Sequence, residues 1–554
     1  MLPAAGCRDD GGGAPGGSEG SGTAGPDTEG TGGTADGTAT EGDTEGGEIN
    51  VIPPPGGMRR LTPEQYVSIV TLIFGAAAGD VADPPPLPAL GTFDSQTAAQ
   101  EPLTPVDIEA YETSSRSIGT VVSNDPAGLT AMVPCVATED ASCYDTLARD
   151  LGRFVWRRPL IEDEVTTLVA IAEAGQEWAN GDFYEGIKYQ ISAMLQSPNF
   201  LYVQEVGEPT GEADLRELRQ YELASRLSFF LLGHTPDLAL LDAAEGGGLE
   251  TDEQVQALAV EMLDRPEARQ RLAEFYDELY RLRDLATKGK DDVLFPTFSP
   301  TLAAAMRQET QLLIENVVFE EEGNFLDIFD ANYTFVNDEL AQVYNMPPPA
   351  FPWQLVPLPA EQSRAGFLSH PGFLTVFSHP DVNSPTRRGL FVQEHLLCTD
   401  IQPPPADANP MPPSPVEGQT IREWLESVHN ADPSCATCHN LMDPVGFAFE
   451  RYDPIGAFRQ LDNGLPIDST GDVAGLGSFG NAAELAGLLR NDPRVPNCVV
   501  RNLYRSTLGY DEGLDQAEGI AALDEAFSES EFNYKTLMVE LTVNPLFRLV
   551  DAPK

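Results

Sequence analysis

Apolar side chains recur at helical spacing along most of the chain from Met58 onward. They fall on one helical face in residues 160–172 and again, four positions apart, in residues 183–195. This spacing places them on one face of a helix, and we expect these two helices to form an antiparallel pair. The two-residue alternation typical of strands is rare and short. The pattern therefore predicts a mainly α-helical protein.

Proline-rich breaks divide the helical pattern into several units, as expected for a chain of 554 residues. Thr62-Pro63-Glu64-Gln65 opens the first unit with a capping hydroxyl and a proline at the first helical position. DPPPLPALG interrupts this unit, and we expect loops to dominate from there to about residue 145. MPPPAFPWQLVPLP has the composition of a linker. The predicted units are an N-terminal helical and loop-rich unit at 58–145, a helix-pair unit at 146–208, a larger helical unit at 209–346, a unit with a cysteine motif at 362–475 and a C-terminal helical unit at 476–554.

Residues 1–57 have a different composition from the rest. Gly, Thr, Ser, Asp and Glu dominate residues 11–47, which cannot bury enough apolar area to fold, so we expect a disordered acidic tether. Ala5-Gly6-Cys7 resembles the cleavage box of bacterial lipoproteins, in which Cys7 would be lipidated. The other regions of a signal peptide are missing, so either the start codon is placed too late or the match is accidental. We expect an exported lipoprotein of the cell envelope, in the periplasm or on the outer surface.

The chain is strongly acidic, with 87 acidic and 33 basic residues and a formal net charge of -54. This charge would repel nucleic acid and anionic lipid, and a soluble surface adapted to an extracellular or salty setting explains it most simply. No apolar run is long enough to span a bilayer, so we expect membrane contact only through the lipid anchor. A redox partner with a basic docking surface would be attracted to this charge.

A C-x-x-C-H motif at Cys435, Cys438 and His439 carries the clearest chemistry. Positions i, i+3 and i+4 share one helix face, so two thiols can bond to a haem while the imidazole binds its iron from one side. This composition would produce on the order of 0.001 such matches by chance. The motif therefore predicts one covalently attached haem c, with His439 as an axial iron ligand.

Other chemistry stays open for the same motif. The C-x-x-C could form half of a zinc site, completed by His429, His439 or Cys498. It could also form a redox disulfide, although such motifs normally occur in a βαβ setting that this chain lacks.

The second axial ligand of the iron is less clear. No histidine follows His439, and Met442 is too close along the chain to reach the opposite haem face easily. His429 is the better candidate, because it extends the apolar face of its predicted helix, although the sequence favours an ordinary half-buried histidine at this position. The other possibilities are Met538, His370, His379, His395 and a five-coordinate iron.

The residues after the motif offer candidate surroundings for a haem. The Asp-Pro-x-Gly sequences at 443–446 and 453–456 are typical of turns. Aromatic side chains could line a haem pocket or simply pack in the core: Phe447, Phe449 and Phe458. Charged side chains could pair with haem propionates or form ordinary salt bridges: Glu450, Arg451 and Arg459.

Four further cysteines form an even set, as expected in an exported protein. We predict a short disulfide loop between Cys135 and Cys143. We predict a second disulfide between Cys398 and Cys498, which would join the motif-bearing unit to the C-terminal unit. Buried free thiols are the alternative.

Several stretches in a fixed order resemble a known family. They are MRRLTPEQY, FVWRRPL, SPNFLYVQE, YELASRLSFFLLGHTPD, NYTFVNDELAQVY, RAGFLSHPGFL, SPTRRGLFVQEHLLC, CATCHNLMDPVGFAFERYDPIGAFR and VRNLYRSTLGY. Together they resemble large multidomain proteins of planctomycetes and myxobacteria, whose modules are known as planctomycete cytochrome c-like and associated domains of unknown function. The resemblance implies an exported protein with a haem motif at Cys435, Cys438 and His439. It implies no substrate, reaction or second axial ligand.

These observations favour an envelope-anchored c-type haem protein that transfers single electrons to or from a redox partner. A haem-dependent oxidoreductase is the alternative, and whether the protein is an enzyme stays open. A non-catalytic surface scaffold with a zinc or disulfide C-x-x-C is the third possibility. No motif for hydrolysis or phosphoryl transfer stands out. No sequence feature determines the oligomeric state.

Overall fold

The computed structural model describes residues 52–88, 91–212, 214–402, 418–429 and 433–552. This part of the protein is mainly helical, as the hydrophobic pattern predicts, and each of its strands has four residues or fewer. The acidic tract at 11–47 and Cys7 lie outside the described residues. No helix in the described ranges combines the length and hydropathy needed to cross a membrane.

The N-terminal third forms a helical bundle around its own cluster of buried apolar side chains, which extends from Leu61 to Phe229. Helices α7 and α8 pack against each other as predicted, and α4 packs on the same helix α8. The elements of this part are β1 (Gly57–Arg60), α1 (Pro63–Phe74), α2 (Ala76–Gly79), α3 (Asp94–Gln100), α4 (Pro105–Asn124), α5 (Ala127–Met132), α6 (Cys143–Val155), α7 (Glu162–Trp178), α8 (Phe183–Gln196), α9 (Pro198–Leu201) and β2 (Tyr202–Glu205). Strands β1 and β2 pair antiparallel.

Helices α1 and α4 begin with the same local signal. Thr62 accepts a hydrogen bond from the Gln65 amide at 3.2 Å, and Thr104 accepts one from the Asp107 amide at 3.3 Å. A proline follows each cap at the first helical position. The expectation that loops dominate up to residue 145 is wrong at α4. Its buried face mixes Ser and Gly with few large apolar residues, so the apolar periodicity is weak there.

A second, larger cluster of buried apolar side chains extends from Phe93 and Leu218 to Val550. It is shared by the segments that we predicted as three separate units. Its first elements are β3 (Glu208–Pro209), β4 (Leu215–Glu217), α10 (Gln220–Leu231), α11 (Leu238–Glu245), α12 (Asp252–Leu263), α13 (Pro266–Leu279), α14 (Pro300–Glu315), η3 (Asn316–Glu320), α15 (Asp327–Asp330), β5 (Tyr333–Val336), α16 (Asp338–Val343) and β6 (Gln354–Pro357). Strand β6 lies in the segment that we predicted as a linker, and it pairs antiparallel with β5.

The C-terminal part of the chain returns to the middle of the molecule. Strand β11 pairs antiparallel with β4, and α24 packs against α12. The remaining elements are α17 (Pro371–Val376), α18 (Pro385–Phe391), η6 (Val392–Leu396), α19 (Ile421–His429), α20 (Pro433–Phe447), β7 (Leu461–Asp462), β8 (Leu465–Pro466), β9 (Gly471–Val473), β10 (Gly477–Phe479), α21 (Ala482–Arg490), α22 (Arg494–Leu508), α23 (Ala517–Glu529), α24 (Tyr534–Val543), α25 (Pro545–Arg548) and β11 (Leu549–Asp551).

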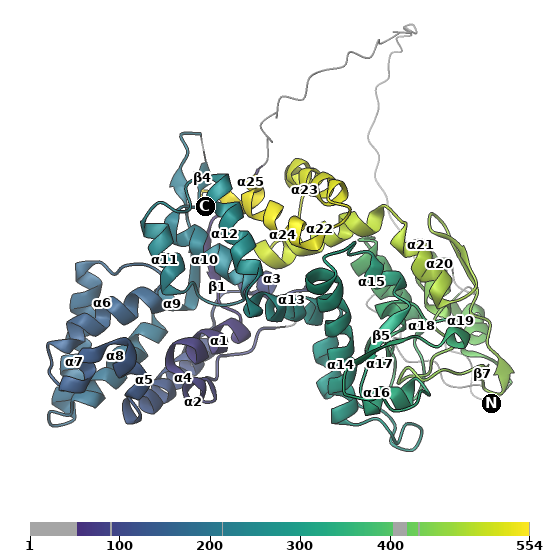
Figure 1. The fold of residues 1–554 in the computed structure, drawn as a ribbon, viewed down its shortest axis with the longest axis horizontal. Helices are drawn as coiled ribbons and strands as arrows, with labels where there is room; N and C mark the ends of the chain where they lie inside the picture. The colour runs from purple at the N-terminus through teal and green to yellow at the C-terminus, as the bar shows by residue number, and fades with distance from the viewer. Residues whose placement is uncertain (1–51, 89–90, 213, 403–417, 430–432, 553–554) are drawn as a thin grey trace, which may run out of the picture.

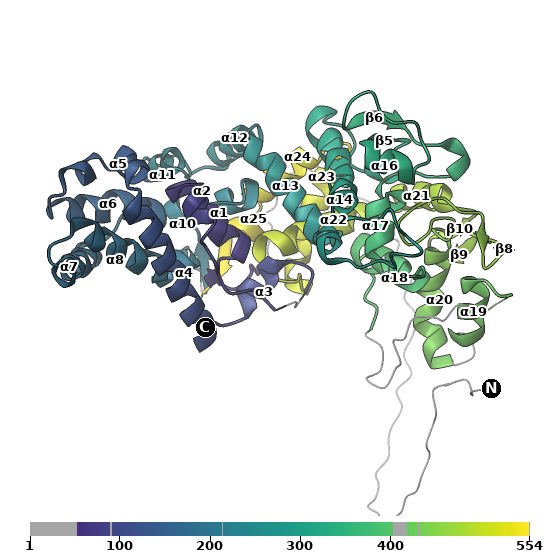
Figure 2. The same ribbon diagram turned by 90° about the horizontal axis from the view of Figure 1, so that it is seen from below.

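The molecule is elongated. Figure 1 shows α6, α7 and α8 at one end and α19 and α20 at the other, with the yellow C-terminal helices between them. Figure 2 shows the same order from below. The cysteine motif therefore lies at one end of the body, away from the N-terminal bundle.

Candidate haem-attachment site

The C-x-x-C-H motif lies on α20, near the start of this helix. Cys435, Cys438 and His439 therefore share one helix face, as their spacing predicts. Neither cysteine forms a disulfide, and all three residues are partly exposed. One turn of helix thus presents two thiols and one imidazole together.

Asp443 orients the imidazole of His439. The Nδ1 atom of His439 lies 3.2 Å from each carboxylate oxygen of Asp443, one helical turn further on. Thr386 on α18 donates its hydroxyl hydrogen to the Oδ1 atom of Asp443 at 2.6 Å. Metal-binding histidines commonly donate their second ring N–H to a carboxylate in this way. From the sequence we predicted only a turn at Asp443, although its four-residue spacing from His439 indicates that the two side chains share a helix face.

Two glycines allow α18 and α20 to pack closely. A Cβ atom on Gly389 would lie 1.8 Å from the Met442 carbonyl oxygen, and one on Gly446 would lie 1.9 Å from the Pro385 carbonyl oxygen. Only glycine permits these backbone approaches. The close crossing is what brings Thr386 within reach of Asp443.

The two Asp-Pro-x-Gly sequences have different structures. The second forms a turn, because the Gly456 amide donates to the Asp453 carbonyl at 2.9 Å and Gly456 has φ +86°. The turn expectation is wrong for the first, where Pro444 lies inside α20. Packing of α20 against α18 keeps residues 443–446 helical, although Pro444 has no backbone N–H to donate within the helix.

The predicted haem surroundings are mostly engaged in packing. Phe449 is fully buried in the larger apolar cluster, and the guanidinium of Arg422 lies 4.7 Å from the centre of the Phe447 ring. Glu450 is buried and accepts from Arg459 at 3.0 Å. Burial raises the pKa of Glu450 above its usual value, and Arg459 opposes this. Phe458 packs against the same cluster, and Arg451 helps to lower the pKa of Asp468.

The candidate axial ligands lie in different places. His370 is buried, with Nδ1 3.0 Å from the Thr310 hydroxyl and Nε2 3.4 Å from the Thr334 hydroxyl. Burial lowers its pKa to about 3. This histidine thus belongs to a hydrogen-bonded cluster on α14, β5 and α17.

Burial lowers the pKa of both His379 and His395 to about 4, and nearby cationic side chains, Arg387 for His379 and Arg281 for His395, act in the same direction. The ring of His395 packs on Phe391 at 5.1 Å between centroids. Met442 and Met538 are both buried. His429 is the last residue of α19, which packs on α20, but its side chain lies outside the described part of the chain.

Both predicted disulfide bonds are present. Cys135 is joined to Cys143, and Cys398 is joined to Cys498 across 100 residues. The second bond excludes Cys498 from the zinc site that we considered. Within the described ranges, no group of three or more Cys, His, Asp or Glu side chains is arranged to hold a metal ion.

Three protein-family models match consecutive parts of the chain. PSD5, a protein of unknown function (DUF1595), matches residues 143–205, and PSD4, a protein of unknown function (DUF1592), matches residues 218–346. PSCyt3, a protein of unknown function (DUF1588), matches residues 364–462, which include α20. Comparisons with curated proteins and with solved structures give no match. The chain therefore belongs to the family of planctomycete cytochrome C-associated domain proteins, whose function is unknown.

Proposed function

We propose that this protein is a c-type haem protein that carries single electrons. One haem would be attached through the thiols of Cys435 and Cys438, with His439 as an axial ligand. The observation that carries this proposal is the pair formed by the His439 imidazole and the buried Asp443 carboxylate on the same helix face as the thiols.

The donor set fits a haem attached to α20. Because the Asp443 carboxylate accepts a hydrogen bond from Nδ1 of His439, the imidazole would bind iron through its other nitrogen, Nε2. The carboxylate also makes the imidazole a stronger electron donor, and Thr386 keeps that carboxylate in place. When bound, haem iron alternates between two oxidation states and so carries one electron. The protein would supply covalent attachment, ring orientation and the local charge.

The proposed location is the cell envelope. Two disulfide bonds support it, because such bonds persist mainly in oxidising compartments. We extend the proposal to a lipid anchor at Cys7. The net charge of -54 supports a redox partner with a basic docking surface. Partner association should weaken as ionic strength rises, and association insensitive to salt would contradict this.

Pyridine haemochrome spectroscopy tests the haem directly. The full chain is produced with a cytochrome c maturation system, and we expect a covalently bound c-type haem. The double substitution Cys435→Ser and Cys438→Ser should abolish it. Cys135→Ser with Cys143→Ser is the matched control, because it removes two distant cysteines and should leave the haem content unchanged.

The outcomes separate the alternatives. Absence of covalent haem from the wild-type protein, or equal haem in the Cys435/Cys438 variant, would refute the proposal and favour the scaffold. If haem is bound, rapid CO binding to the reduced protein would indicate an open iron position and an oxidoreductase. A spectrum unaffected by CO would support a second axial ligand, for which we propose His429.

A further inference from the structure

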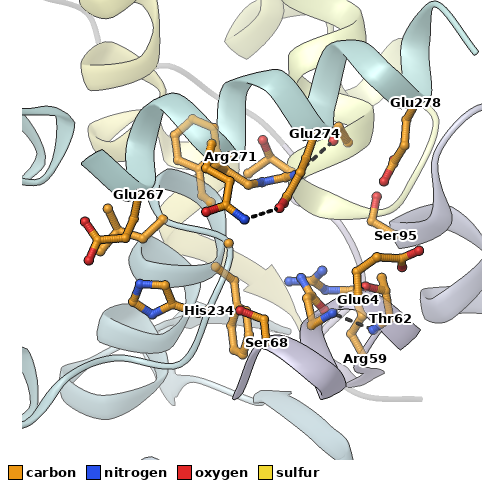
Figure 3. A pocket seen from close by; sticks show the side chains of 18 of the residues that line it. Arg59, Thr62, Glu64, Ser68, Ser95, His234, Glu267, Arg271, Glu274 and Glu278 are labelled. Carbon is orange, nitrogen blue, oxygen red and sulfur yellow. Dashed lines mark hydrogen bonds and ion pairs between the residues drawn. The ribbon is translucent and has the colours of Figure 1, made fainter. Parts of the chain in front are cut away.

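A polar cavity is lined by residues of β1, α1, α3 and α13. Figures 1 and 2 show that α1, α3 and α13 lie far from α20. The cavity has a volume of about 60 Å³ and adjoins a groove of about 920 Å³, with which it shares lining residues that include Glu64, Ser68 and His234. Figure 3 shows Glu267, Arg271, Glu274 and Glu278 of α13 facing the side chains from β1 and α1. The cavity is thus lined by elements that are distant in sequence.

Among the residues that the structure describes, three buried polar side chains that line the cavity each have an atom without a hydrogen-bond partner. They are the Nε atom of Arg59, the Oγ atom of Ser95 and the Nε2 atom of His234. Each side chain belongs to a residue that is at most 7 % exposed. A buried polar group without a hydrogen-bond partner lowers the free energy of unfolding by about 1–3 kcal/mol. Three such groups around one cavity therefore indicate that another molecule forms hydrogen bonds with them.

The hydrogen-bonding roles of these atoms differ. The Nδ1 atom of His234 lies 2.7 Å from the Thr235 carbonyl oxygen, so Nδ1 carries a hydrogen and Nε2 is the ring atom left for a hydrogen bond with a ligand. Arg59 Nε donates only, and the Ser95 hydroxyl can do both. A hydroxyl-bearing ligand can satisfy all three, because each hydroxyl both donates and accepts.

Each arginine and glutamate that lines the cavity has an oppositely charged side chain within 4.0 Å. The guanidinium of Arg283 contacts the carboxylates of Asp94 and Glu278 at 2.9 Å, and that of Arg59 lies 3.5 Å from Glu205. Glu267 and Glu274 would repel an anion, while Arg271 and Arg59 would repel a cation. Burial raises the pKa of Glu278 to about 7, so its carboxyl group is partly neutral near that pH.

We propose that this cavity binds the end of a neutral, hydroxyl-rich molecule such as a saccharide. The apolar side of the groove supports this class, because Leu72, Pro86 and Leu87 line it and can pack on the C–H face of a sugar ring. The proposal is independent of the haem, since it concerns a site at a different place in the body.

Binding is tested by calorimetric titration of the full chain with neutral α- and β-linked hexose tetrasaccharides. Uronate tetrasaccharides and a neutral tetrapeptide are the comparison ligands. We expect saturable binding of at least one neutral tetrasaccharide and at least tenfold weaker binding of the others. Tighter binding of a uronate or of the peptide would overturn the assigned class, and no saturable binding of any neutral saccharide would overturn the proposal.

Ser95→Ala is the decisive variant, with Ser228→Ala as its matched control. Both serines are buried, and neither hydroxyl has a hydrogen-bond partner in the described part of the chain, but of the two only Ser95 lines the cavity. Ser95→Ala should weaken binding about tenfold, the loss expected for one hydrogen bond, without lowering the melting temperature. Ser228→Ala should leave binding unchanged. A lower melting temperature with unchanged binding in Ser95→Ala would show that the hydroxyl is structural and overturn the proposal.

Discussion

Asp443 illustrates at the residue scale how one carboxylate can control a neighbouring ligand. It is buried on α20, and both of its oxygens lie 3.2 Å from Nδ1 of His439. Because its charge lies close to the proposed iron ligand, it should stabilise the oxidised and more positive state of the iron.

Asp443→Asn should therefore raise the reduction potential of the haem-loaded protein, by on the order of tens of millivolts. The amide can still accept from Nδ1, so covalent haem content should stay the same. Potentiometric titration followed in the visible spectrum measures the shift. Asp472→Asn, an exposed substitution on β9 next to α20, is the control, and an equal shift there would argue against a specific role for Asp443.

Glu309 is a second buried carboxyl group with a measurable consequence. Its Oε1 atom accepts from Thr334 at 2.6 Å and from Tyr344 at 2.5 Å, while burial raises its pKa to about 7. Between about pH 4.5 and pH 7 the folded protein keeps this proton after the unfolded chain has lost it. The free energy of unfolding therefore falls as the pH rises through this range.

Glu309→Gln should remove the contribution of this carboxyl group to the pH dependence of the unfolding free energy. The decrease in unfolding free energy between pH 5 and pH 8 should become smaller by on the order of 3 kcal/mol, while other groups contribute equally to both proteins. Urea unfolding at the two pH values provides the measurement. Glu315→Gln, at the end of the same helix α14 and in a partly exposed ion pair, should change little. An unaltered pH dependence in Glu309→Gln would contradict the prediction.

At the element scale, the crossing of α18 and α20 positions the candidate site. Buried Arg388 on α18 donates to the carbonyls of Phe449 and Leu374 at 3.1 and 3.0 Å, which ties α18 to the chain after α20 and to α17. The glycines at the crossing then set how closely the two helices approach.

Gly389→Ala should separate these helices, because the new methyl group cannot fit beside the Met442 carbonyl. We expect the free energy of unfolding to fall by about 3 kcal/mol. Gly487→Ala on α21 is the matched control, because a Cβ atom there meets no neighbour within 4 Å. That variant should gain about 0.5–1 kcal/mol, since alanine favours a helix. Similar destabilisation in both variants would contradict the role assigned to the crossing.

At the scale of the whole molecule, the C-terminal helices hold the two ends of the body together. Strand β11 pairs with β4, and Cys498 on α22 is bonded to Cys398 just after η6. The larger apolar cluster consequently contains side chains from Phe93 to Val550. Removal of this C-terminal part would expose the core on both of its sides.

The two disulfide bonds should contribute unequally to stability. Cys398→Ser with Cys498→Ser should lower the free energy of unfolding by about 4–5 kcal/mol, because this bond closes a 100-residue loop. Cys135→Ser with Cys143→Ser, which opens a short loop, should cost about 2–3 kcal/mol. Urea unfolding of the oxidised proteins compares them, and the reverse order would contradict loop closure as the main effect.

Local sequence signals predicted the helices that have a strong apolar stripe. The cap at Thr62 and the pairing of α7 with α8 followed from residue spacing alone. Helix α4 and strand β6 were missed, because a face rich in Ser and Gly and a proline-rich segment look like loops until their packing partners are known.

The sequence by itself determined the mainly helical class and the shared helix face of Cys435, Cys438 and His439, because both depend on local spacing. It predicted the disulfide bonds from four cysteines that allow three pairings, and the structure decided for Cys135–Cys143 and Cys398–Cys498. Only the tertiary structure decided that Thr386 holds Asp443 against His439 and that Arg59, Ser95 and His234 meet at one cavity. Such contacts join residues far apart along the chain, and close packing of separate elements creates them.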